Sequence, residues 1–186
     1  MSFLTTDYSN VQPSGYEPLP TGEYEMILAN AKEDATPSGA ETLQIDLIVR
    51  NDLTNVPSLM ATNGKYANRH VFMDNWKRKA THQYDLDGFM HILKAVGVPE
   101  GTSINSVDDF INLITRKPVN VYVKKEVDTY KTTDQNNPVY RNSVAPWNFN
   151  ITKFKEVNHQ FANKQQNQSQ QPQGNSVEFD EDSFPF

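Results

Sequence analysis

Aromatic and basic residues lie side by side at several places in the middle of this sequence. The set comprises Lys65, Tyr66, Arg69, Phe72, Trp76, Lys77, Arg78, Lys79, Tyr122, Lys124, Tyr130, Lys131, Tyr140 and Arg141. Unpaired nucleic-acid bases stack on aromatic rings for about 1–3 kcal/mol each, while Lys and Arg side chains follow the phosphates. The set therefore predicts a surface for single-stranded nucleic acid, provided that the fold brings it into one groove. Such pairs also occur on ordinary solvated strand faces.

The two tryptophans have different surroundings in the sequence. Trp76 lies in a polar and basic run, residues 74–79, that has no apolar periodicity, so we expect it to stack on bases. Trp147 alternates with Phe149 and Ile151, a pattern typical of one strand face, so we expect it in the core.

Charge is distributed unevenly along the 186 residues, whose formal net charge is −6. Residues 65–79 contain five basic residues and one acidic residue, whereas residues 175–186 contain four acidic residues and no basic one. Because local charge decides where a polyanion binds, the acidic average does not exclude nucleic acid. The sequence has no cysteine, which fits a cytoplasmic protein, and no apolar stretch long enough for a membrane helix, so we expect no membrane association.

The sequence offers little to a catalytic site. Its four histidines show no metal-ligand spacing, and the pairs Asp85/Asp87 and Asp108/Asp109 each stand at a predicted helix start, where the helix dipole favours acids. We therefore expect no catalytic residue, no metal and no cofactor. Two alternatives stay open: an adaptor that binds proteins but not DNA, and a magnesium-dependent nuclease with Asp108 and Asp109 as ligands.

Hydrophobic periodicity predicts a mostly β body. Apolar residues alternate with polar ones within residues 24–28, 42–50, 70–73, 119–123 and 147–151, which indicates five strands. Turn residues in 36–39 favour a hairpin between the first two strands. In the fourth strand, a period of two places Tyr122 and Lys124 on the face opposite the valines.

Two helices interrupt this series between the third and fourth strands. The first is predicted by an apolar stripe that ends near Gly97 and consists of Leu86, Phe89, Met90 and Leu93. The second follows Ser106 and Asp109, which resemble a capping box. The order predicts a mainly β fold, a five-stranded OB-fold barrel with a helical insert between strands 3 and 4, plus a disordered C-terminal tail.

Composition divides the chain into four parts. We expect an irregular arm over 1–20, the OB-fold nucleic-acid-binding domain over 21–156, a disordered Gln/Asn-rich linker over 157–176 and an acidic partner-binding tip over 177–186. Residues 158–176 contain seven Gln and four Asn, which is too little apolar surface to offset chain entropy. The exposed strand edges of an OB barrel leave a homo-oligomer open.

The last ten residues combine acids with aromatic residues. Asp180, Glu181 and Asp182 precede Ser183 and the terminal sequence Phe184-Pro185-Phe186. This end resembles the C-terminal tail of bacterial single-stranded DNA-binding proteins, an acidic run followed by Ile-Pro-Phe. Phe184 stands in place of the Ile, and Ser183 separates it from the acids. In layout, the long helical insert and the strand ending in Tyr130 resemble similar proteins from replication modules of phages of Gram-positive bacteria.

This resemblance implies a protein that coats single-stranded DNA in replication and recombination, in the host cytoplasm if phage-encoded, and has no enzymatic activity. It implies that the tip recruits replication and recombination enzymes: Pro185 and Phe186 enter an apolar pocket of the partner, and Asp180, Glu181 and Asp182 steer the encounter. We also hypothesise that the tip competes with DNA for the basic groove. Deleting residues 175–186 should then strengthen DNA binding, most at low salt.

Overall fold

The computed structural model describes residues 17–162. Most of the predicted linker, from residue 163 onward, and the whole tip over 177–186 lie outside the described residues, as do residues 1–16 of the predicted N-terminal arm. Within 17–162, no helix is both long and apolar enough to cross a membrane.

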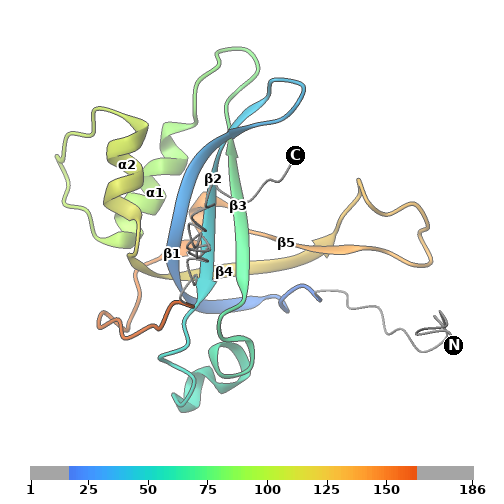
Figure 1. Ribbon diagram of the computed structural model, residues 1–186, viewed down its shortest axis with the longest axis vertical. Coiled ribbons are helices and arrows are strands. Elements are labelled where there is room, and N and C mark those ends of the chain that lie inside the picture. The colour runs from blue at the N-terminus through green and yellow to red at the C-terminus, as the bar shows by residue number, and fades with distance from the viewer. Residues whose placement is uncertain (1–16, 163–186) are drawn as a thin grey trace, which may run out of the picture.

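An antiparallel sheet of six strands forms the body (Figure 1). The strands are β1 (Gly22–Ala35), β2 (Glu41–Val49), β3 (His70–Trp76), β4 (Pro118–Val127), β5 (Tyr140–Ser143) and β6 (Phe149–Asn150). They follow the order β3-β2-β1-β4-β5, and β6 pairs with β4. The long strand β1 pairs with β4 through its first half and with β2 through the rest, with an irregularity between Leu28 and Asn30. Strand β4 therefore runs across the direction of β2 and β3 (Figure 1).

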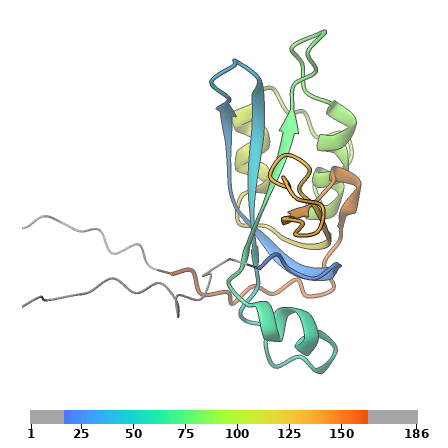
Figure 2. The ribbon, with the colours of Figure 1, turned by 90° about the vertical axis from the view of Figure 1, so that its right-hand side faces the viewer.

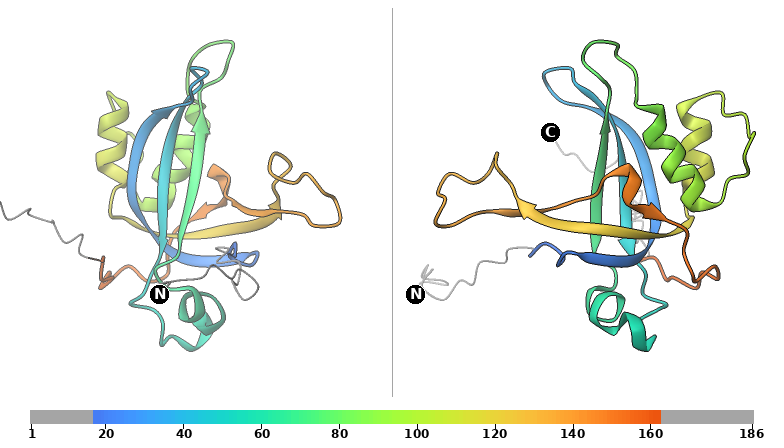
Figure 3. Two further views of the ribbon diagram at one scale, coloured as in Figure 1. Left: turned by 45° about the vertical axis from the view of Figure 1, so that its right-hand side comes forward. Right: turned by 180° about the vertical axis from the view of Figure 1, so that it is seen from behind.

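The predicted five-stranded OB-fold barrel is not confirmed, because the observed sheet is open and has six strands. Within the described residues, β3 and β5 form no ladder with each other. The reason lies in β5, which is four residues long and pairs only with Lys124–Val127 at the far end of β4. The β4–β5 hairpin thus projects from one side of the sheet, whereas the two helices lie on the other (Figure 3).

The core lies between the sheet and the helices α1 (Leu86–Val96) and α2 (Val107–Ile114). The alternation predicted for the first, second and fourth strands is confirmed, because all its apolar positions are fully or almost fully buried: Tyr24, Met26, Leu28, Leu43, Ile45, Leu47, Val49, Val119, Val121 and Val123. The turn at 36–39 is also confirmed, with the Thr36 N–H donating to the Ala40 carbonyl at 2.8 Å.

The predicted stripe of α1 is wrong in part. Phe89 and Leu93 are buried as expected, but Leu86 and Met90 are more than 60% exposed. Ile92 and Ala95 are the other core residues of the helix. The capping prediction for α2 is confirmed: the Ser106 hydroxyl accepts the Asp109 N–H at 3.0 Å, and the Asp109 carboxylate accepts the Asn105 N–H at 3.2 Å.

The predicted core position of Trp147 is wrong, because its side chain is 68% exposed. Residues Pro146–Asn148 form the 3-10 turn η3, and β6 is limited to Phe149–Asn150. Pro146 packs so closely on α1 that a Cβ at Gly88 would lie 3.1 Å from the proline Cγ. This contact fixes the turn against the helix and leaves Trp147 facing solvent.

Candidate nucleic-acid interface

The outer face of the sheet, away from the helices, carries an aromatic row on β3. Residues alternate strictly along this strand, and His70, Phe72, Asp74 and Trp76 are the exposed set. Phe72 is 53% exposed and Trp76 is 45% exposed, and the rings of His70 and Phe72 are stacked 6.3 Å apart. A strand rises about 3.3 Å per residue, so Phe72 and Trp76 emerge about 13 Å apart on one face. The structure extends the predicted strand by three residues and thereby places Trp76 in this row.

Polar side chains of β2 line the row. In the register of the two strands, Asp46 lies opposite Phe72, and Gln44 lies opposite Asp74. The Asp46 carboxylate is 2.7 Å from His70 Nδ1, and the Gln44 amide donates to the Asp74 carboxylate at 3.2 Å. Two carboxylates in the middle of the face repel phosphates, so this part of the surface suits bases rather than the backbone of a nucleic acid.

The basic run after Trp76 is largely neutralised by neighbouring acids. Lys77 lies 3.1 Å from Glu41 and 3.8 Å from Glu33, and its ammonium group also sits 5.0 Å from the centre of the Tyr84 ring. Arg78 pairs with Asp85 at 3.2 Å. Lys79 is exposed and forms no ion pair with any residue that the structure describes.

Tyr84 anchors this arrangement by donating its hydroxyl proton to Glu33 at 2.7 Å. Burial of the ring and the nearby Glu33 carboxylate raise the pKa of the Tyr84 phenol, so the hydroxyl stays protonated and keeps donating.

The β4–β5 hairpin carries a second aromatic and basic group. Tyr122 and Lys124 point away from the core on β4, as predicted. On β5, Tyr140 is 44% exposed, and the Lys125 ammonium lies 5.1 Å from its ring centre. Arg141 pairs with Glu126 at 2.9 Å.

The loop of this hairpin presents Tyr130 at 91% exposure. Its shape comes from Asp128, whose buried carboxylate accepts the backbone N–H groups of Tyr130 and Lys131 at 3.0 and 3.2 Å. This is an Asx-type turn, which fixes the backbone on both sides of an exposed ring. The Tyr130 backbone is therefore positioned even though its side chain contacts solvent.

Three of the predicted residues belong instead to the connection between β2 and β3, which includes the short helices η1 (Pro57–Leu59) and η2 (Met60–Gly64) below the sheet in Figure 2. Tyr66 is partly buried and meets Tyr24 edge-on at 6.3 Å, with the Lys65 ammonium 5.3 Å from its ring centre. The Arg69 guanidinium donates to the Glu17 carbonyl. Tyr66 thus contributes to packing, and burial raises the pKa of its neighbour Tyr24 to about 12.

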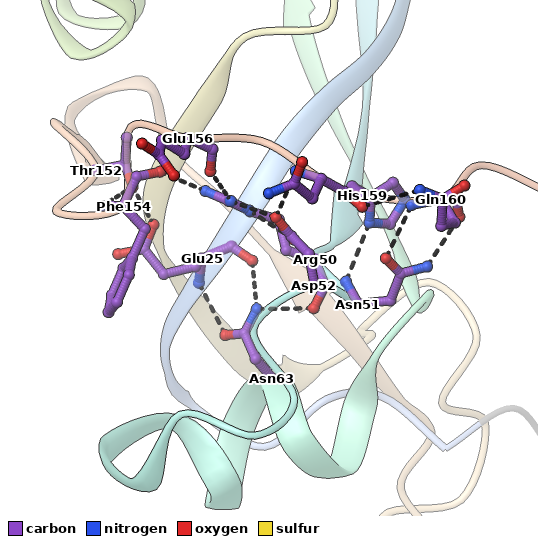
Figure 4. Close-up of polar contacts among 11 residues, drawn as sticks. Glu25, Arg50, Asn51, Asp52, Asn63, Thr152, Phe154, Glu156, His159 and Gln160 are labelled. Atoms are coloured by element: carbon purple, nitrogen blue, oxygen red, sulfur yellow. Dashed lines mark hydrogen bonds and ion pairs between the residues drawn. The ribbon is translucent and has the colours of Figure 1, made fainter.

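A C-terminal strap, residues 151–161, lies across β1 and β2 (Figure 4). It contacts Arg50, just after the end of β2, whereas Trp76 pairs with Thr42 at the start of that strand. The strap is held by Arg50, which is fully buried. The Arg50 guanidinium makes two hydrogen bonds to the Asp52 carboxylate at 3.0 and 2.6 Å, a third to the Phe154 carbonyl at 2.6 Å and a fourth to the Glu156 carbonyl.

Further contacts continue along the strap. The Thr152 hydroxyl donates to buried Glu25 at 2.5 Å, and His159 Nδ1 accepts the Asn51 N–H at 3.0 Å. Residues 157–160 of the predicted linker thus lie against the body. At the other end of the described chain, Leu19 of the predicted arm is fully buried and exchanges hydrogen bonds with Asn142.

The strap sets the protonation of two groups. Burial alone would raise the pKa of Asp52, but hydrogen bonds from Arg50 and the Asn158 N–H outweigh it and lower the pKa. Burial lowers the pKa of His159, as do the Arg50 and Arg116 charges. Because Nδ1 of His159 accepts a hydrogen bond, its proton sits on the buried Nε2, which has no hydrogen-bond partner within residues 17–162.

Neither the place of His70 in the aromatic row nor the strap was predicted from the sequence. A signal for His70 was present, since it alternates with Phe72. No local pattern predicted the strap, because its partners lie about a hundred positions earlier in the chain.

The described residues thus define an open antiparallel β-sheet protein with two helices on one face and an aromatic row on the other. Among them, no three His, Asp or Glu residues are grouped so as to hold a metal ion. The chain belongs to the family described as "Protein of unknown function (DUF669)", whose sequence profile matches residues 4–173. A comparison with curated proteins found no match.

Proposed function

We propose that this protein binds single-stranded DNA, without sequence preference and without catalysis, along the outer face of β3 and the β4–β5 hairpin. The observation that carries the proposal is the row of exposed rings on β3, because a soluble protein gains no stability from leaving Phe72 and Trp76 half in water. Flat rings spaced along one strand suit successive unstacked bases.

The topology supports this placement. An OB-fold is a partly open, five-stranded barrel that binds oligonucleotides with its strand 2–3 face and the loops flanking it. We propose that β1 to β5 form a variant of this fold, opened between β3 and β5, with α1 and α2 as the insert before β4. The aromatic row then lies on the face that such folds use, and the loop with Tyr130 is the one after the fourth strand.

Phosphate contacts in this proposal fall mainly on lysines that have no acidic partner. Lys79, Lys124 and Lys131 are exposed and form no ion pair with a described residue. Lys77, Arg78 and Arg141 are paired with carboxylates. They would have to exchange these partners for phosphates, which limits their contribution to DNA affinity. We therefore expect few phosphate contacts and a modest salt dependence, with base stacking supplying most of the affinity.

The tip belongs to the same proposal. Its acids Asp180, Glu181 and Asp182 and its terminal Phe184, Pro185 and Phe186 would recruit enzymes of DNA replication or recombination to the coated strand. The support is the sequence itself, four acids and three phenylalanines within ten residues at the end of the chain.

A fluorescence titration tests the proposal. In the variant Trp147→Phe, Trp76 is the only tryptophan, so quenching by DNA reports on the aromatic row. We expect saturable quenching by oligo-dT, weaker quenching by duplex DNA, and a log–log salt slope of about −0.7 per phosphate contacted. Oligo-U in the same assay measures the preference for DNA over RNA. Equal affinity for oligo-dT and duplex would contradict the proposal.

A further inference from the structure

A small pocket lies between the C-terminal half of α1 and the η3–β6 segment, apart from the aromatic row. Its volume is about 280 Å³. Its apolar walls come from Trp147, Phe149, Ile151 and Ala95, and its polar rim comes from His91 and the charged Lys94. Sites for small molecules usually measure about 300–1,000 Å³. The pocket lies at the lower end of this range and has room for one or two side chains of a peptide.

Two walls of the pocket, Trp147 and Ile151, are exposed, and the turn that carries Trp147 is firmly held. Trp147 is 68% exposed and Ile151 is 58% exposed. The turn that carries Trp147 is closed by the Asn148 N–H, which donates to the Ala145 carbonyl at 2.9 Å, and it is seated on α1 through Pro146. Tryptophan is one of the residue types enriched at the energetic centre of protein interfaces. Nothing in the DNA-binding proposal uses it.

The electrostatics of the pocket select the charge of its ligand. No Asp or Glu lines it, and Lys94 forms no ion pair with any residue in 17–162. A ligand for this pocket therefore carries large apolar side chains flanked by carboxylates. Within this chain, residues 177–186 have that composition: Val177, Phe179, Phe184, Pro185 and Phe186 are interspersed with four acids.

We propose that the Trp147 pocket binds the C-terminal residues 177–186 of this protein. A phenylalanine ring of this segment enters between Trp147 and Ile151, and its acids lie near Lys94. Docked in this way, the tip would be withheld from other proteins until a competitor with higher affinity removes it. The inference does not depend on DNA binding.

Chain length permits this contact. Fourteen residues, 163–176, connect the described body to residue 177, and they span at most about 50 Å when fully extended. A body of 146 described residues has an expected radius of gyration of about 15 Å. The tip thus reaches much of the surface of its own body, and its effective concentration there exceeds that of any partner at micromolar levels.

Tryptophan fluorescence tests the proposal without nucleic acid. In the full chain with Trp76→Phe, Trp147 is the only tryptophan. We expect that adding Phe184→Ser and Phe186→Ser shifts its emission to longer wavelength and increases its quenching by acrylamide. Dilution shows whether the bound segment belongs to the same chain or to a second copy. A contact within one chain survives dilution, whereas a contact between two chains is lost.

A peptide of residues 177–186, added to the tip-substituted chain, should reverse the shift in a saturable manner. Lys94→Glu should weaken this binding about tenfold, because an attraction becomes a repulsion. Lys32→Glu, a charge reversal on β1, is the matched control and should leave the peptide affinity unchanged. The proposal is overturned if the emission of Trp147 is the same with and without the two phenylalanines and the peptide causes no saturable change.

Discussion

Asp52→Asn should destabilise the protein strongly, because it removes the only charged partner of a fully buried arginine among the described residues. The Asp52 carboxylate lies 2.6 Å from the Arg50 guanidinium, and the two side chains are 9% and 0% exposed. Removing one member of a buried ion pair costs about 3–5 kcal/mol, since the other charge stays in a medium of low polarity. Asparagine retains one hydrogen-bond acceptor, so we expect the free energy of unfolding to fall by about 3 kcal/mol, the lower end of this range.

The chain offers a matched control for this substitution. Asp34 also lies 2.6 Å from its partner, Lys32, but both side chains are about half exposed. Asp34→Asn removes the same charge at the same distance and should leave stability unchanged within error, because solvent screens an exposed pair. Urea denaturation of both variants measures the difference, and hydrogen exchange at the Asn158 N–H, which Asp52 accepts at 2.8 Å, reports release of the strap.

The pH dependence gives a second readout of the same pair. The pKa of Asp52 is lowered in the folded state, so its contribution is fully present above the unfolded value of about 3.9 and is lost as the pH falls through the folded pKa. The native protein and Asp52→Asn should therefore converge in stability on acidification below pH ~4. If Asp52→Asn and Asp34→Asn change the free energy of unfolding equally at neutral pH, the buried Arg50–Asp52 ion pair does not hold the strap.

Two further predictions concern the strap and the Trp147 turn. The pKa of His159 is lowered in the folded state, so below the ordinary histidine pKa of about 6.5 the unfolded chain binds more protons than the folded one. The free energy of unfolding should therefore fall as the pH drops from 7 toward the folded pKa. His159→Asn should make this pH dependence flatter, as measured by urea titrations. An unchanged slope would mean that His159 stays accessible to protons. Gly88→Ala should lower the melting temperature even though alanine favours helices by up to about 1 kcal/mol, because its Cβ would press on the rigid Pro146 ring. A rise in melting temperature would show that the turn moves freely away from α1.

Local patterns in the sequence predicted most of the strands. The valines at 119, 121 and 123 face the core because a period of two allows one buried face, and the Ser106 cap depends on residues three positions apart. These features need no distant partner, so sequence alone is sufficient to predict them.

Features that depend on distant contacts could not be predicted in this way. Trp147 fits the pattern of a buried strand, yet the contact of Pro146 with Gly88 turns it outward. Lys77 counts as a basic residue in the sequence, but the pairing of β2 with β3 places Glu41 beside it. The strap forms only because Arg50 is brought to residues more than a hundred positions later.

The central claim is that unpaired bases stack on the outer face of β3, and the affinity of Phe72→Ala for oligo-dT tests it most directly. Loss of one stacking ring is worth about 1–3 kcal/mol, which corresponds to a dissociation constant about 5- to 150-fold higher. Met60→Ala removes a side chain that is also more than half exposed, but in η2, and is the matched control. We predict that Phe72→Ala weakens binding in this range while Met60→Ala leaves it unchanged; equal affinities of the two variants would contradict the claim.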